Sequence, residues 1–151
     1  MDAVPAPKSI EKPVLAKGIK ILLAEDNDIN ASIIQDMLST QKAMVVRVAD
    51  GELALQAVQQ HDFDIVLMDC QMPNMDGYVA TKYIRQLESE KSNIPIVAIT
   101  ANAYAEDRQL YLDAGMNEHI SKPVDKTALI SVLFSLVDSR ANGSNLSHYK
   151  K

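Results

Sequence analysis

The sequence predicts an α/β protein in which helices cover both faces of a doubly wound parallel sheet. Two hydrophobic periods alternate between about residues 19 and 138: short apolar or β-branched runs, and longer segments with apolar residues at helical spacing. Five such strand–helix pairs follow one another, which is typical of a parallel sheet built from right-handed crossovers. The chain has 151 residues, 47% of them hydrophobic, which suffices for one core of ordinary size.

The strands are predicted where apolar runs stop abruptly at polar residues. The first run stops at the acidic pair Glu25 and Asp26, and the β-branched residues of the other runs favour strands. The predicted strands are Ile19–Ala24, Met44–Val48, Phe63–Met68, Ile94–Ile99 and Glu118–Ser121.

The helices are predicted from apolar stripes and from end signals. Asp50–Gly51 and Asp76–Gly77 open the second and third helices, Gly115 suits the C-cap of a weaker fourth helix over 105–114, and Asp125 suits the N-cap of the last. The expected stripes are Ile29, Ile33, Ile34, Met37 and Leu38; Leu53, Ala54, Ala57 and Val58; Ala80, Tyr83, Ile84 and Leu87; Leu129, Val132, Leu133 and Leu136.

Composition excludes several classes of protein. A net charge of −5 and a pI near 5.1 argue against a direct nucleic-acid binder, and a single cysteine excludes a disulfide framework. The chain has neither an apolar run of membrane-spanning length nor the apolar core of a signal peptide, so we expect no membrane contact and a cytoplasmic location. We expect a Pro-rich arm or linker over 1–18, one domain over 19–138 and a polar tail over 139–151.

Polar residues follow four of the predicted strands, at the sheet edge where such folds bind ligands. They are Glu25, Asp26, Asp69, Thr100 and Lys122. Two carboxylates ~4 Å apart repel by roughly 4 kcal/mol at an effective dielectric near 20, so three of them favour a bound cation or a retained proton. An all-oxygen, partly hydrated site suits Mg²⁺, and a carboxylate beside it can act as a nucleophile toward phosphorus.

Each of these residues also has an ordinary structural interpretation. The acidic pair can cap a helix, Asp69 can form a turn, Thr100 is a common strand residue and a loop lysine is usually solvated. Their joint occurrence at successive strand ends is what favours the functional interpretation.

Four stretches resemble the receiver domain of two-component response regulators. They are ILLAEDNDIN, DFDIVLMDCQMPNMDG, IPIVAITANA and GMNEHISKP, which together span residues 21–123. The resemblance implies a flavodoxin-like fold with strand order 2-1-3-4-5 and five helices. It also implies a Mg²⁺ cofactor and a phosphoryl group transferred from a phosphohistidine of a histidine kinase or histidine phosphotransfer protein.

The resemblance also implies residue roles. Asp69 corresponds to the phosphoacceptor, Lys122 to the phosphate-binding lysine before a proline that is often cis, and Thr100 to the switch hydroxyl. The expected metal ligands are Asp26, Asp69, Glu25 through water, and the backbone carbonyl of Gln71. His119 stands where the family often has Tyr or Phe, so it is a second candidate switch residue. The acidic pair is Glu-Asp rather than Asp-Asp.

Among known receivers, the pattern AEDN…MDCQMPNMDG…AITANA is similar to those of hybrid sensor histidine kinases. We therefore expect the receiver part of such a kinase, whose parent chain can be membrane-anchored and enzymatic, while the receiver assists its own phosphorylation and dephosphorylation. A stand-alone single-domain regulator is an alternative. A Mg²⁺-dependent aspartyl-phosphate phosphatase is another, although that class needs an acid where this chain has Gln71. A flavin-binding module is disfavoured because Glu25 and Asp26 would repel a flavin phosphate.

Overall fold

The computed structural model describes residues 18–101 and 105–137. The tail expected over 139–151, and all but the last residue of the arm expected over 1–18, lie outside the described residues. Within the described part, every helix is too short or too polar to cross a bilayer.

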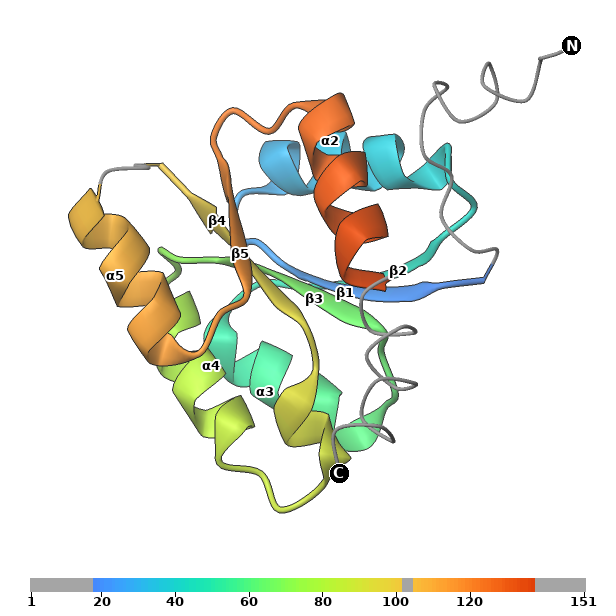
Figure 1. The fold of residues 1–151 in the computed structure, drawn as a ribbon. Helices are drawn as coiled ribbons and strands as arrows, with labels where there is room; N and C mark the ends of the chain where they lie inside the picture. The colour runs from blue at the N-terminus through green and yellow to red at the C-terminus, as the bar shows by residue number, and fades with distance from the viewer. Residues whose placement is uncertain (1–17, 102–104, 138–151) are drawn as a thin grey trace, which may run out of the picture.

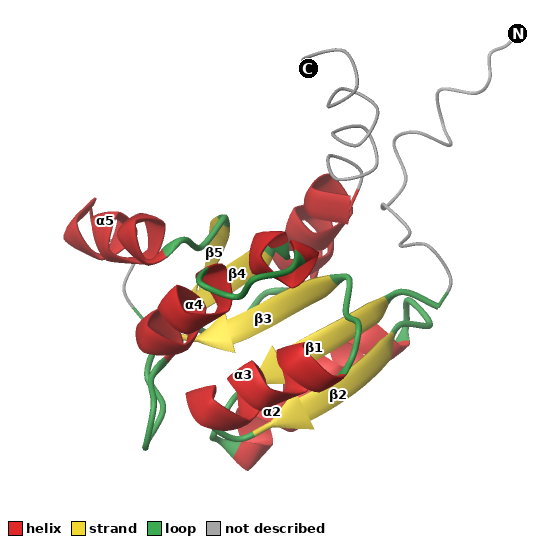
Figure 2. Cartoon of the chain, turned by 90° about the horizontal axis from the view of Figure 1, so that it is seen from below, coloured by secondary structure: helices red, strands yellow, loops and turns green. Residues whose placement is uncertain are grey.

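One parallel sheet forms the centre of the fold (Figure 1). Its strands are β1 (Lys20–Ala24), β2 (Met44–Val48), β3 (Ile65–Asp69), β4 (Ile96–Thr100) and β5 (Glu118–Ser121). Their order is β2-β1-β3-β4-β5, which confirms the predicted topology. Figure 2 shows the arrowheads of β1, β2 and β3 at the same edge, so their carboxyl ends meet there.

In the described residues, four helices and one 3₁₀ turn connect the strands, and a fifth helix follows the last strand. They are α2 (Asp28–Ser39), α3 (Gly51–Gln60), α4 (Gly77–Arg85), η1 (Glu90–Asn93), α5 (Ala105–Ala114) and a last helix over 126–137. As expected, the side chain of Asp125 caps the last helix, accepting a hydrogen bond from the Ala128 amide at 2.9 Å. The 3₁₀ turn was not predicted, because its polar sequence EKSN has no hydrophobic period.

The helices cover both faces of the sheet, as Figure 1 shows. On one face α2 and the last helix pack on alternate strand residues; on the other lie α3, α4 and α5. The first core contains Ile21, Leu23, Ile34, Leu38, Ile65, Leu67, Val97, Ile99, Leu129 and Leu133; the second contains Leu22, Ala54, Val66, Met68, Ala80, Ile84, Ile96 and Tyr111.

Three of the predicted stripes were partly wrong. In α2 the buried residues are Ala31, Ile34 and Leu38, whereas Ile29 is 71% and Ile33 46% exposed. Leu53 and Tyr83 are also exposed, and Leu87 lies beyond the end of α4. A stripe of apolar residues wider than the contact with the sheet leaves its outer members in solvent, and periodicity alone does not say which edge of the stripe is covered.

Strand register places the polar residues side by side at the carboxyl edge. Ala24 pairs with Met68, so Glu25 and Asp69 follow neighbouring positions on β1 and β3. Asp69 pairs with Ile99, which puts Thr100 one residue beyond on β4. Thr100 pairs with Ser121, so Lys122 extends from β5 at the same edge. The bond between Lys122 and Pro123 is cis, as the resemblance implied.

Candidate functional site

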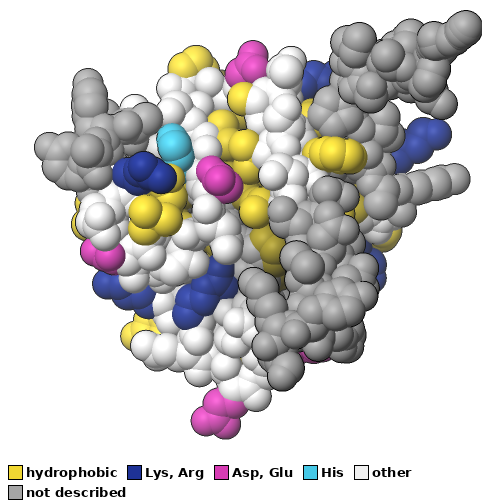
Figure 3. Space-filling view, in the orientation of Figure 1, with side chains coloured by type: hydrophobic (Ala, Val, Ile, Leu, Met, Phe, Trp, Pro, Cys, Tyr) yellow, Lys and Arg dark blue, Asp and Glu magenta, His cyan; other side chains and the backbone are white. Residues whose placement is uncertain are grey.

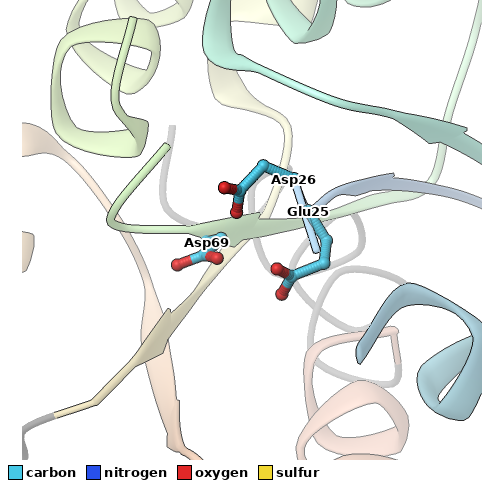
Figure 4. A group of neighbouring side chains, drawn as sticks. All are labelled: Glu25, Asp26 and Asp69. Carbon is cyan, nitrogen blue, oxygen red and sulfur yellow. The ribbon is translucent and has the colours of Figure 1, made fainter. Parts of the chain in front are cut away.

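Three carboxyl groups converge at the carboxyl ends of β1 and β3 (Figure 4). One oxygen from each of Glu25, Asp26 and Asp69 lies within 4.8 Å of the others. Glu25 and Asp69 are 0% and 1% exposed, whereas Asp26 is exposed. The cluster therefore joins two desolvated acids to one that water reaches.

Glu25 is the most deeply buried of the three acids. Its Oε2 accepts a hydrogen bond from the Asn27 amide at 3.1 Å, while its Oε1 accepts none from the residues that the structure describes. Burial raises the pKa of Glu25 to about 7, and the charge of Asp69 adds to the rise, while the Asn27 amide opposes it. Glu25 thus holds a proton or an unsatisfied charge unless a cation shares the site.

Lys122 brings a positive charge into the cluster. Its Nζ lies 2.9 Å from Asp69 Oδ2 and 3.9 Å from Glu25 Oε1. Burial lowers the pKa of Lys122, but the hydrogen bond and charge of Asp69 outweigh this and raise it overall, so the ammonium stays charged. One ammonium partly offsets three acids and leaves a net negative site.

The loop after β3 fixes the Asp69 side chain. Asp69 Oδ1 accepts a hydrogen bond from the Gln71 amide at 3.0 Å, and the Gly77 amide donates to the Cys70 carbonyl at 3.2 Å. Gly77 starts α4 directly against β3: a Cβ there would collide with the Asp69 carbonyl oxygen and lie 2.8 Å from Met68 Cγ. Gly77 therefore permits the close approach that holds this loop over the strand end. Cys70 is buried in the core.

The two candidate switch residues occupy different places. Thr100 is 6% exposed at the end of β4, next to the strand that ends in Asp69. His119 pairs with Ala98 in the sheet, and its Nδ1 lies 2.8 Å from the hydroxyl oxygen of Tyr111, a buried residue of α5. Thr100 thus belongs to the acidic edge, whereas His119 joins β5 to α5. The sequence did not indicate the Tyr111 contact.

Arg47 is a further residue of this edge that sequence analysis missed. It stands in the strand MVVRV, and its side chain reaches the carbonyl oxygen of Glu25 with Nε at 2.9 Å and Nη2 at 2.7 Å. Its Nη1 contacts Asp28 Oδ1 at 2.9 Å. A lone arginine in a β-branched run was the available signal, because such a charge needs a partner when the strand is partly buried.

The donor set fits a small divalent cation of the Mg²⁺ type. The three candidate ligand atoms are all carboxylate oxygens, Glu25 Oε1 has no hydrogen-bond donor among the described residues, and exposed Asp26 leaves the site open to water. Mg²⁺ prefers oxygen ligands, uses one or two carboxylates and retains several waters. A contribution from the backbone carbonyl of Gln71 stays a prediction from the resemblance.

Comparison with known proteins identifies relatives of this fold and site. Residues 21–134 match the model of the response regulator receiver domain. The chain is 41% identical over 126 residues to the sensor protein GacS of Pseudomonas syringae, and 40% identical over 116 residues to the autoinducer 2 sensor kinase/phosphatase LuxQ of Vibrio vulnificus. The alignments cover 82% of this chain for GacS and 77% for LuxQ. They cover only 14% and 13% of the length of those two proteins, so the chain is similar to one part of each.

Solved structures give the same result. The receiver domain of a sensor histidine kinase from Pseudomonas aeruginosa, with a magnesium ion coordinated in its active site cleft, is 41% identical, with a TM-score of 0.76 over 81% of this chain and 99% of that one. A receiver domain from Saccharomyces cerevisiae, solved with a histidine phosphotransfer protein, is found at 28% identity and a TM-score of 0.77, covering 84% and 94% of the two chains. Hybrid signal transduction histidine kinase M of Dictyostelium discoideum is 42% identical over 121 residues, which are 78% of this chain and 5% of that protein. The chain therefore belongs to the response regulator receiver domain family of two-component systems and is homologous to the receivers of hybrid sensor histidine kinases.

Proposed function

We propose that this receiver accepts a phosphoryl group on Asp69 from a phosphohistidine of a partner protein, in a Mg²⁺-dependent reaction. The observation that carries the proposal is the juxtaposition of three carboxylates within 4.8 Å with an ammonium 2.9 Å from one of them. None of the three acids, nor the lysine, belongs to either hydrophobic core.

Asp69 is the nucleophile in this mechanism. The amide of Gln71 orients its carboxylate through Oδ1 and Lys122 through Oδ2. An oxygen of Asp69 forms a bond to phosphorus while the phosphorus–nitrogen bond breaks, and its electron pair leaves with the imidazole of the partner. The product is an acyl phosphate on Asp69 and a histidine with its nitrogen restored.

The neighbouring residues stabilise the added charge. A phosphorylated side chain carries about −1.5 to −2 charges, and the Lys122 ammonium is placed to bind a phosphoryl oxygen, with the Thr100 hydroxyl as a donor to another. When bound, Mg²⁺ supplies Lewis-acid neutralisation of phosphoryl oxygens. The residues that would hold it are Asp26, Asp69, Glu25 acting through water, and the backbone carbonyl of Gln71.

The partner surface is proposed beside this site. A pocket of about 320 Å³ is lined by Glu25, Asn30, Ile33, Ile34, Lys122, Pro123 and Val124. Ile29, 71% exposed, lies one turn before Ile33 on α2. An apolar surface next to the phosphoacceptor suits an amphipathic helix of a histidine phosphotransfer protein or kinase. The relative solved with such a protein supports this choice of partner.

The face formed by α5, β5 and the last helix is proposed to change when Asp69 is phosphorylated. Its exposed apolar side chains include Leu110, Leu112 and Phe134, and Figure 3 shows hydrophobic side chains among scattered charged ones on this side of the molecule. A Thr100 hydroxyl drawn to the phosphoryl group would bias this face, with His119 following. The parent protein is proposed to be a hybrid sensor histidine kinase, which the hybrid kinase among the relatives supports, with a stand-alone regulator as the alternative.

The test is phosphorylation by a small phosphodonor with Mg²⁺, followed by intact mass and peptide mapping. We expect one hydroxylamine-labile phosphoryl group on Asp69. It should not form when Mg²⁺ is chelated before the phosphodonor is added, nor in Asp69→Asn. Sustained release of phosphate from unrelated phosphate esters would instead support the phosphatase. A stable adduct on another residue would refute the assignment of Asp69.

A further inference from the structure

The side chain of Arg47 hydrogen-bonds to the loop after β1, which carries two of the three acids, Glu25 and Asp26. Arg47 donates two hydrogen bonds to the Glu25 carbonyl oxygen, at 2.9 and 2.7 Å, and one to Asp28 Oδ1 at 2.9 Å. Arg47 therefore hydrogen-bonds to both ends of the segment 25–28, which contains Asp26. The side chain of Arg47 is 24% exposed and that of Asp28 is 90% exposed, so the carbonyl contact is the less solvated of the two.

The other side-chain hydrogen bonds of this loop are local: the Asn27 amide donates to Glu25 Oε2 at 3.1 Å, and Asn27 Oδ1 accepts from the Asn30 amide at 2.9 Å. The ladder between β1 and β2 ends with the pair Ala24 and Val48, and the last backbone bond across it runs from the Glu25 amide to the Val48 carbonyl at 3.0 Å. Beyond that point, the Glu25 carbonyl faces Arg47 rather than a neighbouring strand. Mutual repulsion of the carboxylates tends to open the loop, so a bond on its backbone opposes this displacement.

The geometry of arginine suits this task. Arg47 lies opposite Leu23 in the sheet, on the β2 strand, and its rigid planar fork places two N–H groups on one carbonyl while a third reaches α2. A lysine has a single nitrogen and cannot reproduce the paired bonds. The fork thus fixes the direction of the Glu25 peptide as well as its position.

We infer that Arg47 is a positioning residue for the cation site: by holding the Glu25 carbonyl and Asp28, it keeps the carboxylates of Glu25 and Asp26 directed at that of Asp69. The inference rests on the proposed function and deepens it. Arg47 touches neither the cation nor the phosphoryl group, and it acts through the backbone that carries their ligands.

Positioning and simple electrostatics predict opposite signs. Removing a positive charge near an acidic site strengthens its attraction for a cation, so a purely electrostatic Arg47 would weaken Mg²⁺ binding in the native protein. If Arg47 instead positions the ligands, it strengthens Mg²⁺ binding in the native protein, because carboxylates that are already held in place need not be ordered when the ion binds. Loss of groups that orient metal ligands typically costs 10–100-fold in affinity.

The experiment titrates Mg²⁺ into isotope-labelled full chain and follows backbone amide resonances by NMR, with Arg47→Met, Arg47→Lys and Lys91→Met as variants. Lys91 is the matched control: it also donates to backbone carbonyls, those of Val58, Gln59 and His61, but at the C-terminal end of α3. We expect Mg²⁺ affinity to fall about 10–100-fold in Arg47→Met and by a similar amount in Arg47→Lys, and to stay within about twofold in Lys91→Met. Asp28→Asn should have the smaller effect, since its contact is the more solvated one.

A second readout needs no metal. In metal-free protein, hydrogen exchange at the Glu25 amide should accelerate in Arg47→Met and stay unchanged in Lys91→Met. If the methionine variant does not fold, Arg47→Lys carries the comparison, because it keeps the charge and loses the paired bonds. Equal or tighter Mg²⁺ binding by both Arg47 variants would overturn the positioning role alone. Failure of the native chain to bind Mg²⁺ would overturn the proposed site and this inference with it.

Discussion

Glu25→Gln should make the stability of the metal-free protein less dependent on pH. Burial raises the pKa of Glu25 from 4.5 to about 7 in the folded protein, so the folded chain keeps a proton that the unfolded chain has released. The stability that Glu25 contributes is therefore fully present below pH 4.5, falls as the pH rises toward 7, and levels off above it. At 1.36 kcal/mol per pKa unit, the loss between pH 5 and pH 8 is about 2–3 kcal/mol.

The glutamine variant keeps the hydrogen bond that Glu25 Oε2 accepts from the Asn27 amide and removes the titration. Urea unfolding followed by far-UV circular dichroism in the presence of a chelator measures the effect, because the chain has no tryptophan for fluorescence. The native protein should lose about 2–3 kcal/mol more than Glu25→Gln from pH 5 to pH 8. Glu88→Gln, at an exposed carboxylate, is the matched control and should follow the native curve.

Magnesium extends the same argument. A cation that binds the ionised cluster should stabilise the native protein more at pH 8 than at pH 5, because protons on Glu25 compete with it. Parallel pH–stability curves for the native protein and Glu25→Gln would refute the reasoning, since they would mean that Glu25 does not bear the desolvation that the structure assigns to it.

Three further changes test other parts of the structure. Arg85→Met should lower the free energy of unfolding by about 3 kcal/mol, because the guanidinium donates to three backbone carbonyls and one side-chain oxygen between α4 and β5. Arg108→Met, at an exposed position, should change it by less than about 0.5 kcal/mol. Equal losses for the two variants in urea unfolding would contradict this. Gly77→Ala should slow phosphorylation by a small donor and lower the melting temperature, because the added Cβ collides with the carbonyl of Asp69; an unchanged calorimetric transition would count against the close approach. Ile29→Asp should slow transfer from a phosphohistidine protein at least tenfold, about 1.4 kcal/mol, and leave the reaction with a small phosphodonor unchanged; a uniform slowing of both would show damage to the site rather than to docking.

Local chemistry was enough to predict most of the elements. The Asp50–Gly51 and Asp76–Gly77 pairs mark helix starts because a carboxylate accepts from the amide three residues on, and the structure has these bonds at 2.9 Å. The strand Met44–Val48 and the helix Ala105–Ala114 have the predicted bounds. The sequence could not distinguish Ile29 from Ile34, because both fit an apolar stripe and only the placement of α2 on the sheet decides which is covered.

The sequence by itself determined the class of fold and the residues of the acidic edge, because strand ends are set by where apolar runs stop. Only the tertiary structure decided how these groups act on one another. Glu25 is buried with one oxygen that has no donor among the described residues, the Lys122 ammonium lies nearer to Asp69 than to Glu25, and Arg47 donates to the Glu25 carbonyl. These contacts join residues 22 to 97 positions apart in the chain, or depend on burial created by every layer at once, so no local pattern encodes them.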